Sequence, residues 1–230
     1  MKIEIKIFLI LSIVLLIDSD IFSQSAAVEF YNKGVQYAVQ GEFVKAKEEF
    51  DKVLKIDSLY SQAELGLKTI NDISKKKIMQ ETGIHIFKGV YYDEQGKFEQ
   101  AISEYIKAIE MNPNYEVAYN NRGMSYYNQG EYERAISDYT KAIGLNPKYA
   151  DAYNNRGIVY YEQGQNNLAI SDYSMAIELN ALYAKAYHNR GLLYIVVLKD
   201  NEKGCADWQR ACELGECYNY YIAKEKGFCP

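Results

Sequence analysis

The sequence predicts an all-α fold, a solenoid in which antiparallel helix pairs stack along the chain. Three observations predict it. A six-residue stretch recurs at a spacing of 34 residues, as Ala118–Gly123, Ala152–Gly157 and Ala186–Gly191. Small and aromatic residues recur at helical spacing within each period, and glycine or proline marks the turns. A fixed period of roughly 20 to 50 residues is typical of stacked supersecondary units.

Each unit carries two apolar stripes, one for each predicted helix. The first stripe has residues at i, i+4 and i+7, which in one unit are Tyr119, Gly123 and Tyr126. The second stripe has the same spacing and consists of Ala135, Tyr139 and Ala142. This spacing places residues on one helix face. Gly123 and Ala135 are small enough for the two backbones to approach, and the rings fill the space beside them.

Turn residues separate the predicted helices. A glycine suited to a left-handed backbone ends the first helix in four units, at Gly41, Gly96, Gly130 and Gly164. Pro113 and Pro147 end two of the second helices, because proline disfavours helical geometry at the residue before it.

This order of aromatic, glycine, tyrosine, alanine and proline resembles the tetratricopeptide repeat, a helix-turn-helix unit of about 34 residues. The resemblance covers nearly all of residues 27–217. It implies a right-handed superhelical solenoid with repeats over 27–60, 82–115, 116–149, 150–183 and 184–218, and a C-terminal cap over 219–230. It also implies that the first helices line a concave groove that binds peptide or protein segments.

Two segments depart from the repeat pattern. Residues 61–81 are an insertion, predicted as a single helix or a linker, with a hinge or subdomain boundary near Thr82–Gly83. In the fifth repeat the turn at Leu198–Asn201 lacks glycine and has one extra residue, and Trp208 takes the aromatic place. A terminal helix over 217–226 is predicted to cover the last apolar face, which a solenoid needs for solubility.

The N-terminus has the pattern of a secretory signal peptide. Lys2 and Lys6 precede an apolar run, Ile7–Ile17, that is too short to span a bilayer as a helix. We expect residues 1–24 to be the signal peptide, with cleavage within Ser23–Ala27 and an uncleaved membrane anchor as the alternative. The protein is then exported, either periplasmic or secreted.

All four cysteines lie in the last 26 residues, as Cys205, Cys212, Cys217 and Cys229. In an exported protein such a set indicates disulfides, whose pairing the sequence alone leaves open. If residues 203–214 and 217–226 form helices that fold back on each other, Cys205 meets Cys229, and Cys212 and Cys217 flank the turn. The two histidines, His85 and His188, are far from the cysteines in sequence, so we expect neither a metal site nor a cofactor.

Composition and motifs exclude several function classes. The formal charge of −5 is spread along the chain, whereas binding nucleic acid needs a basic stripe. The sequence has no phosphate loop, metal-binding helix motif or nucleophile elbow, so we expect no enzymatic activity and no small-molecule substrate.

The groove implied by the resemblance has a candidate recognition row. The first-helix positions left over after packing are occupied by amides, a histidine, apolar residues and tyrosines: Asn120, Asn121, Met124, Tyr127, Asn154, Asn155, Ile158, Tyr161, His188, Asn189 and Leu192. The resemblance implies that Asn121, Asn155 and Asn189 form a ladder that holds a peptide main chain, and an amide suits this role because it both donates and accepts. The alternative is that these amides cap or bridge neighbouring helices.

Charged residues of the first helices have two interpretations. Arg122, Arg156 and Arg190, with Lys33 and Lys88, could bind anionic ligands, but acids stand at the matching second-helix positions: Asp138, Asp172, Asp207 and Glu104. We expect each cation to pair with an acid inside the solenoid. The row formed by Val117, Asp151 and Lys185 lacks the paired cations by which some family members clamp a C-terminal carboxylate.

The sequence therefore predicts a non-catalytic scaffold that binds a protein or peptide partner in the groove. The alternatives are a structural or assembly component of a cell-envelope complex, which would use tyrosine-rich outer surfaces to oligomerise, and an accessory subunit that regulates an enzyme.

Overall fold

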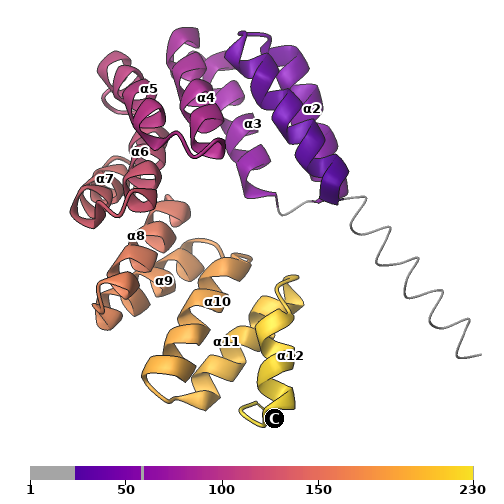
Figure 1. Cartoon of the computed structure of the whole chain (residues 1–230), viewed down its shortest axis with the longest axis vertical. Coiled ribbons are helices and arrows are strands. Elements are labelled where there is room, and N and C mark those ends of the chain that lie inside the picture. The colour runs from indigo at the N-terminus through magenta and orange to yellow at the C-terminus, as the bar shows by residue number, and fades with distance from the viewer. Residues whose placement is uncertain (1–23, 58–59, 230) are drawn as a thin grey trace, which may run out of the picture. The chain divides into compact units, whose positions relative to one another are not determined.

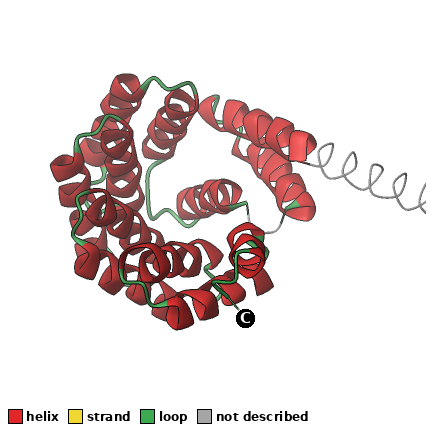
Figure 2. Ribbon diagram, turned by 60° about the horizontal axis from the view of Figure 1, so that its bottom comes forward, coloured by secondary structure: helices red, strands yellow, loops and turns green. Residues whose placement is uncertain are grey.

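The computed structural model describes residues 24–57 and 60–229, and all regular structure in this part of the chain is helical (Figures 1 and 2). The prediction of an all-α fold is confirmed. The chain divides into two compact units, one ending at Asn112 and the other starting at Pro113.

The first unit contains a helix over residues 24–39, followed by α2 (Phe43–Ile56), α3 (Ser61–Ser74), α4 (Gln80–Glu94) and α5 (Phe98–Met111). Phe50 of α2 is fully buried at its centre. A Cβ atom at Gly34 would lie 2.6 Å from the Phe50 ring, and one at Gly66 would lie 2.7 Å from it. The ring is therefore held between two glycines, and Phe87 of α4 stacks on it with a centroid distance of 6.1 Å.

The insertion differs from its prediction as one helix over residues 61–81. α3 ends at Ser74, residues 75–79 form a turn in which Lys76 has a φ of 57°, and α4 begins at Gln80. Thr82 and Gly83, where a hinge was predicted, are buried in the first turns of α4. The apolar spacing of α3 continues into the turn, so the sequence pattern does not reveal the break.

The second unit contains three helix pairs, which a single terminal helix follows (Figure 1). In order these helices are α6 (Glu116–Asn128), α7 (Tyr132–Leu145), α8 (Ala150–Glu162), α9 (Asn166–Leu179), α10 (Ala184–Leu192), η1 (Leu193–Val197), α11 (Asn201–Glu213) and α12 (Tyr218–Glu225). Each predicted repeat from residue 116 to residue 218 holds one first helix and one second helix.

Glycine against an aromatic ring sets the spacing of each pair. A Cβ atom at Gly123 would lie 2.9 Å from the Tyr139 ring. A Cβ atom at Gly157 would lie 2.8 Å from the Tyr173 ring, and one at Gly191 would lie 2.7 Å from the Trp208 ring. Real Cβ atoms do not approach a ring so closely, so a side chain at these positions would push the two helices apart.

The extra residue of the fifth repeat lies in the first helix rather than in the turn where it was predicted. η1 is a π-helical segment, in which the Leu198 N–H donates to the Leu193 carbonyl at 3.1 Å. A π turn holds one more residue than an α turn. Lys199 then has a φ of 56°, the left-handed conformation that glycine takes at the corresponding turn of the other units.

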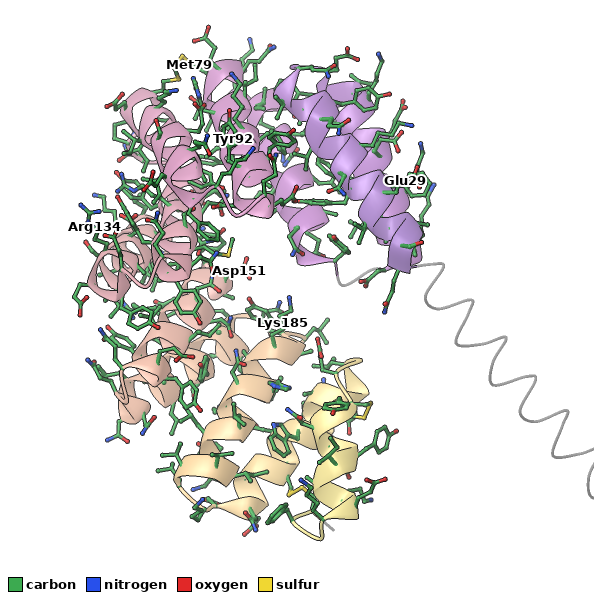
Figure 3. All side chains as sticks on the ribbon, in the orientation of Figure 1. Glu29, Met79, Tyr92, Arg134, Asp151 and Lys185 are labelled. Carbon is green, nitrogen blue, oxygen red and sulfur yellow. A yellow bond between two sulfur atoms is a disulfide. The ribbon has the colours of Figure 1, made fainter. Side chains whose placement is uncertain are left out.

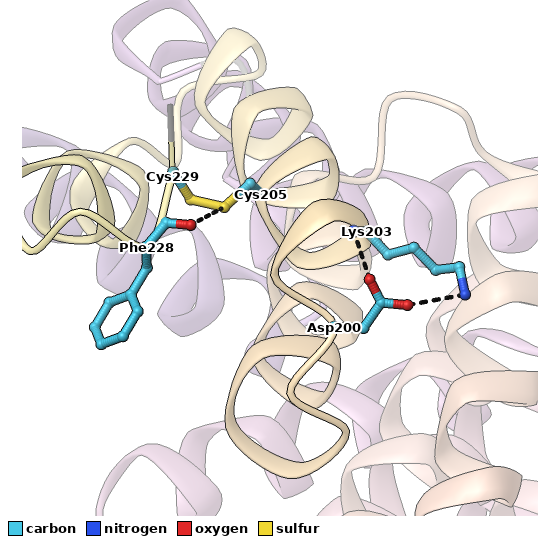
Figure 4. Close-up of a disulfide and its surroundings, with 5 residues drawn as sticks. All are labelled: Asp200, Lys203, Cys205, Phe228 and Cys229. Carbon is cyan, nitrogen blue, oxygen red and sulfur yellow. Dashed lines mark hydrogen bonds and ion pairs between the residues drawn. A yellow bond between two sulfur atoms is a disulfide. The ribbon is translucent and has the colours of Figure 1, made fainter.

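Two disulfides attach α12 to α11. Cys205 pairs with Cys229, as the helix geometry predicts, and Cys212 pairs with Cys217 across the turn. Figure 4 shows the first bridge with the Phe228 carbonyl oxygen 3.3 Å from the Cys205 sulfur. In the same view, the Asp200 carboxylate caps the start of α11 by accepting from the Lys203 backbone N–H at 3.1 Å.

The predicted signal peptide lies outside the described residues except for residue 24, which belongs to the first helix. Among the described helices, none has both the length and the apolar composition that crossing a bilayer requires.

Candidate interaction surface on the first helices

Arginine and aspartate form a bidentate ion pair that recurs between first and second helices in residues 113–230. Arg122 donates through Nε and Nη2 to the two oxygens of Asp138, both at 2.8 Å. The same geometry joins Arg156 to Asp172 and Arg190 to Asp207. The pairs predicted from the sequence for these three arginines are therefore correct.

The three arginines are not candidates for binding an anionic ligand, because each guanidinium already binds a carboxylate of the protein. The carboxylates are buried, and the hydrogen bonds that they accept raise the pKa of each arginine above its usual value. A planar fork bound to both carboxylate oxygens is the strongest form of this interaction. The three cations thus lock first helices to second helices.

The first unit departs from this pattern. Glu104 accepts from His85 Nδ1 and from Lys107 Nζ, each at 2.6 Å, whereas the sequence predicted Lys88 as its partner. Burial alone would raise the pKa of Glu104, but these hydrogen bonds lower it below its usual value. Lys33 Nζ lies 3.9 Å from Glu49, at the limit of an ion pair.

The asparagines of the repeated stretch bond to one another in a single direction. Asn189 donates to Asn154 at 3.1 Å, and Asn154 donates to Asn155 at 3.4 Å. Asn155 donates to Asn120 at 3.1 Å, and Asn120 donates to Asn121 at 3.4 Å. We call this series the amide chain. It links α10, α8 and α6, which is the bridging alternative of the sequence analysis.

Burial divides the members of the amide chain. Asn121 is 1% exposed, and Asn120 and Asn154 are each 3% exposed. The ladder prediction is therefore wrong for Asn121, whose side chain lies inside the protein rather than on an open groove. Asn155 and Asn189 are partly exposed, and each keeps amide hydrogen-bonding capacity that the chain does not use.

The amide chain ends differently at its two sides. Near the C-terminus, Asn219 of α12 places its Nδ2 atom 3.2 Å from His188 Nε2, so the capping helix repeats the contact between neighbouring first helices. Trp208 Nε1 donates to the His188 carbonyl at 3.1 Å, which holds this residue from the other side. At the opposite end, Asn121 Nδ2 is buried without a hydrogen-bond partner in the part of the chain that the structure describes.

Apolar and aromatic side chains stand beside the amide chain. The members that reach solvent are Met124, Tyr127, Ile158, Tyr161 and Leu192, of which Met124 is 38% exposed and the others are partly buried. Ile158 and Tyr161 pack against buried Tyr173 and Leu193. Burial, followed by the nearby Tyr161 and Tyr127, raises the pKa of the Tyr173 hydroxyl above its usual value. We call these five side chains the first-helix surface.

The charged row beside this surface is mixed. Val117 is fully buried, while Asp151 of α8 and Lys185 of α10 stand at equivalent positions and carry opposite charges (Figure 3). Asp151 also accepts from the Tyr183 hydroxyl at 2.6 Å. Burial, followed by Asp151, raises the pKa of that hydroxyl well above its usual value. The row thus offers no pair of cations for a carboxylate.

Metal ligands do not gather in the described residues: no group of three or more histidine, cysteine, aspartate or glutamate side chains could hold an ion there.

Family models match the repeated part of the sequence. Models of the TPR repeat match residues 90–130 and 123–164, and a tetratricopeptide repeat model matches residues 150–181. The chain contains tetratricopeptide repeats. No curated protein matches the sequence.

Solved structures with the same fold include two of MamA. One is 25% identical, covers 80% of this chain and 94% of that chain, and has a TM-score of 0.55. The other is 24% identical, covers 86% and 96%, and has a TM-score of 0.53. A third structure, the first TPR of Spaghetti (RPAP3) bound to an HSP90 peptide, is 30% identical over 48% of this chain and 88% of that chain, with a TM-score of 0.47.

Proposed function

We propose that the protein is an exported, non-catalytic interaction module whose first-helix surface binds an extended or helical segment of another protein. Tetratricopeptide repeat proteins are in general interaction scaffolds without catalytic activity. The observation that supports the proposal here is a row of partly exposed apolar side chains held on a fixed polar base. The two disulfides fit an oxidising compartment outside the cytosol.

The base of the surface favours binding because it is already ordered. The amide chain and the three arginine pairs fix α6, α8 and α10 before a partner arrives. A preorganised surface loses little conformational entropy on binding. Affinity would come from apolar contacts with Met124, Ile158 and Leu192.

Asn155 and Asn189 would add main-chain recognition. Neighbouring first helices lie roughly 8–10 Å apart, and an extended peptide advances roughly 3.3 Å per residue, so the two amides would meet it about three residues apart. Because an amide satisfies a peptide group without reading side chains, the apolar row would provide the selectivity.

A pair of methionines offers a matched test. Met124 on α6 is 38% exposed and Met175 on α9 is 37% exposed, but only Met124 belongs to the first-helix surface. A photo-crosslinking residue is placed at each position in turn, and the protein is expressed in its native compartment. We expect specific adducts from the crosslinker at position 124. A second variant carries the crosslinker at the neighbouring exposed Asn128, and we expect Met124→Asp to abolish its adducts.

Two results would overturn the proposal. One is the same set of adducts from positions 124 and 175, which would mean that contact is not confined to the first helices. The other is an undiminished yield of adducts in the Met124→Asp variant, whose fold is checked by circular dichroism.

An assembly role is the second candidate, and the end of the chain favours it. Tyr218 is 77% exposed and Tyr221 is 59% exposed on α12. The outer face of a capping helix is usually polar, so these two exposed rings are a departure from that pattern. Light scattering distinguishes the two functions. A monomer over a wide concentration range supports the interaction module. A stable oligomer that dissociates when Tyr218 and Tyr221 are changed to Asp supports assembly.

A further inference from the structure

α3 has the position of a first helix but has no second helix after it. In the described chain, α4, α6 and α8 each lead through a short turn into a second helix of 14 residues. α3 leads through residues 75–79 directly into α4. In a repeat protein each unit covers the apolar face of its neighbour. The missing helix leaves part of α2 and α3 uncovered.

The uncovered part is a cleft of about 730 Å³ between α2 and α3. Its apolar walls are Phe43 and Val44 from α2 and Leu67, Ile70 and Ile73 from α3. Val44 is 75% exposed, so it presents an apolar side chain to solvent beside the cleft.

A second hollow of about 560 Å³ continues the cleft toward the end of α5. Ile73 lines both, and the second adds Ile78, Met79 and Met111. Met79 is 55% exposed and Met111 is 37% exposed. Methionine side chains are flexible and adapt to different apolar partners. We call the two hollows together the α2–α3 trough.

The charged residues of the trough are mostly basic. Lys47 and Lys68 line the first hollow, and Lys76 and Lys77 line the second. Among the described lining residues the acid is Asp51, which Lys47 contacts at 2.7 Å, and Lys77 lies 3.3 Å from the buried Asp72 behind the lining. An apolar floor with a basic rim is complementary to a segment that has an apolar face and acidic flanks.

We propose that the α2–α3 trough binds an acidic amphipathic helix of another protein, which takes the place of the second helix that α3 lacks. An amphipathic helix presents side chains at i, i+3, i+4 and i+7, the pattern by which helices occupy apolar grooves. Its glutamates or aspartates would meet the lysines at the rim. The site lies in residues 43–112 and is separate from the first-helix surface, so either proposal can fail without the other.

Two synthetic peptides test both the apolar and the charged part of the proposal. Each has about 18 residues, because shorter isolated helices are marginal in water. Both carry leucine at the i, i+3, i+4 and i+7 positions, and the outer positions are glutamate in one peptide and lysine in its twin. Fluorescence anisotropy with the full chain gives both affinities. We expect the glutamate peptide to bind at least about tenfold more tightly, and added salt to reduce the difference.

Two exposed valines provide matched variants. Val44→Asp places a negative charge in the trough, and Val28→Asp does the same on the helix of residues 24–39, outside the trough lining. Both positions are exposed, so circular dichroism should show that both variants fold. We expect Val44→Asp to weaken the glutamate peptide about tenfold or more and Val28→Asp to leave its affinity unchanged.

Several outcomes would overturn the proposal. They are no saturable binding of the glutamate peptide, equal binding of the two twins, and equal effects of the two valine variants. A homodimer in light scattering that Val44→Asp dissociates would also overturn it, because the occupant of the trough would then be a second copy of this chain.

Discussion

Removal of the central asparagine tests whether the amide chain stabilises the fold. Asn154 is 3% exposed, donates to Asn155 at 3.4 Å and accepts from Asn189 at 3.1 Å. Asn154→Ala removes both bonds, and a neutral hydrogen bond contributes about 0.5–1.5 kcal/mol net. The bond at 3.4 Å is long, and water can reach both partly exposed partners. We therefore expect the free energy of unfolding to fall by about 1–2 kcal/mol.

Urea unfolding with the disulfides intact measures this loss. For a slope of about 2 kcal/mol per molar urea, the midpoint should fall by about 0.5–1 M. A repeat protein can unfold in parts, so hydrogen exchange provides a second measurement. It should show faster exchange of the α8 and α10 amides in the variant.

The control is Asn128→Ala, which removes an exposed asparagine from α6 and should change stability by less than about 0.5 kcal/mol. If Asn154→Ala is equally mild, the amide chain does not stabilise the fold, and the reasoning is refuted. A double-mutant cycle of Asn154 and Asn189 gives a further check, because additive losses would mean that the bond between them contributes nothing.

Three further predictions concern packing, charge and the disulfides. Gly157→Ala places a methyl group 2.8 Å from a tyrosine ring and should cost about 1–3 kcal/mol, whereas Gly144→Ala meets nothing within 4 Å and should raise Tm slightly; equal Tm values would contradict this. Hydrogen bonds hold the pKa of Glu104 below its usual value despite its burial. Their contribution to stability is present above the pKa that a glutamate has in the unfolded chain, and it is lost as pH falls through the folded-state pKa. Glu104→Gln should therefore be less stable than the wild type at pH 6, with a gap that narrows in acid; a gap independent of pH would argue against it. Replacing Cys205 and Cys229 by serine opens a loop of 24 residues and should cost about 3 kcal/mol, measured by urea unfolding, and a loss below about 1 kcal/mol would show that α12 docks without the bridge.

The fold was predictable because its signals are local and repeated. Gly123 and Tyr139 recur 34 residues later as Gly157 and Tyr173, and Trp208 takes the ring position 35 residues after Tyr173, so each pair of helices packs by the same contact. The arginine pairs were predictable for a similar reason, since a second-helix aspartate stands 16 residues after Arg122 and Arg156 and 17 residues after Arg190. The bounds of the individual repeats remain predictions.

The insertion and the fifth repeat were less predictable because backbone geometry decides them. Lys76 and Lys199 both take a left-handed conformation that their residue type does not indicate. The π turn absorbs an extra residue that the sequence pattern assigns to the following loop. Lysine in a left-handed turn carries no distinctive sequence signal, whereas glycine there does.

The sequence by itself determined the helix-pair architecture, the glycine contacts and the three arginine pairs, because each recurs at nearly the same place in successive repeats. Only the tertiary structure decided the role of the asparagines. An amide can hydrogen-bond to a neighbouring helix or to a peptide, and nothing in its chemistry selects between them. The packing of α6, α8 and α10 places Asn155 within hydrogen-bonding distance of Asn120, and Asn189 within that distance of Asn154. Asn121 is buried, so a partner in solution does not reach its side chain.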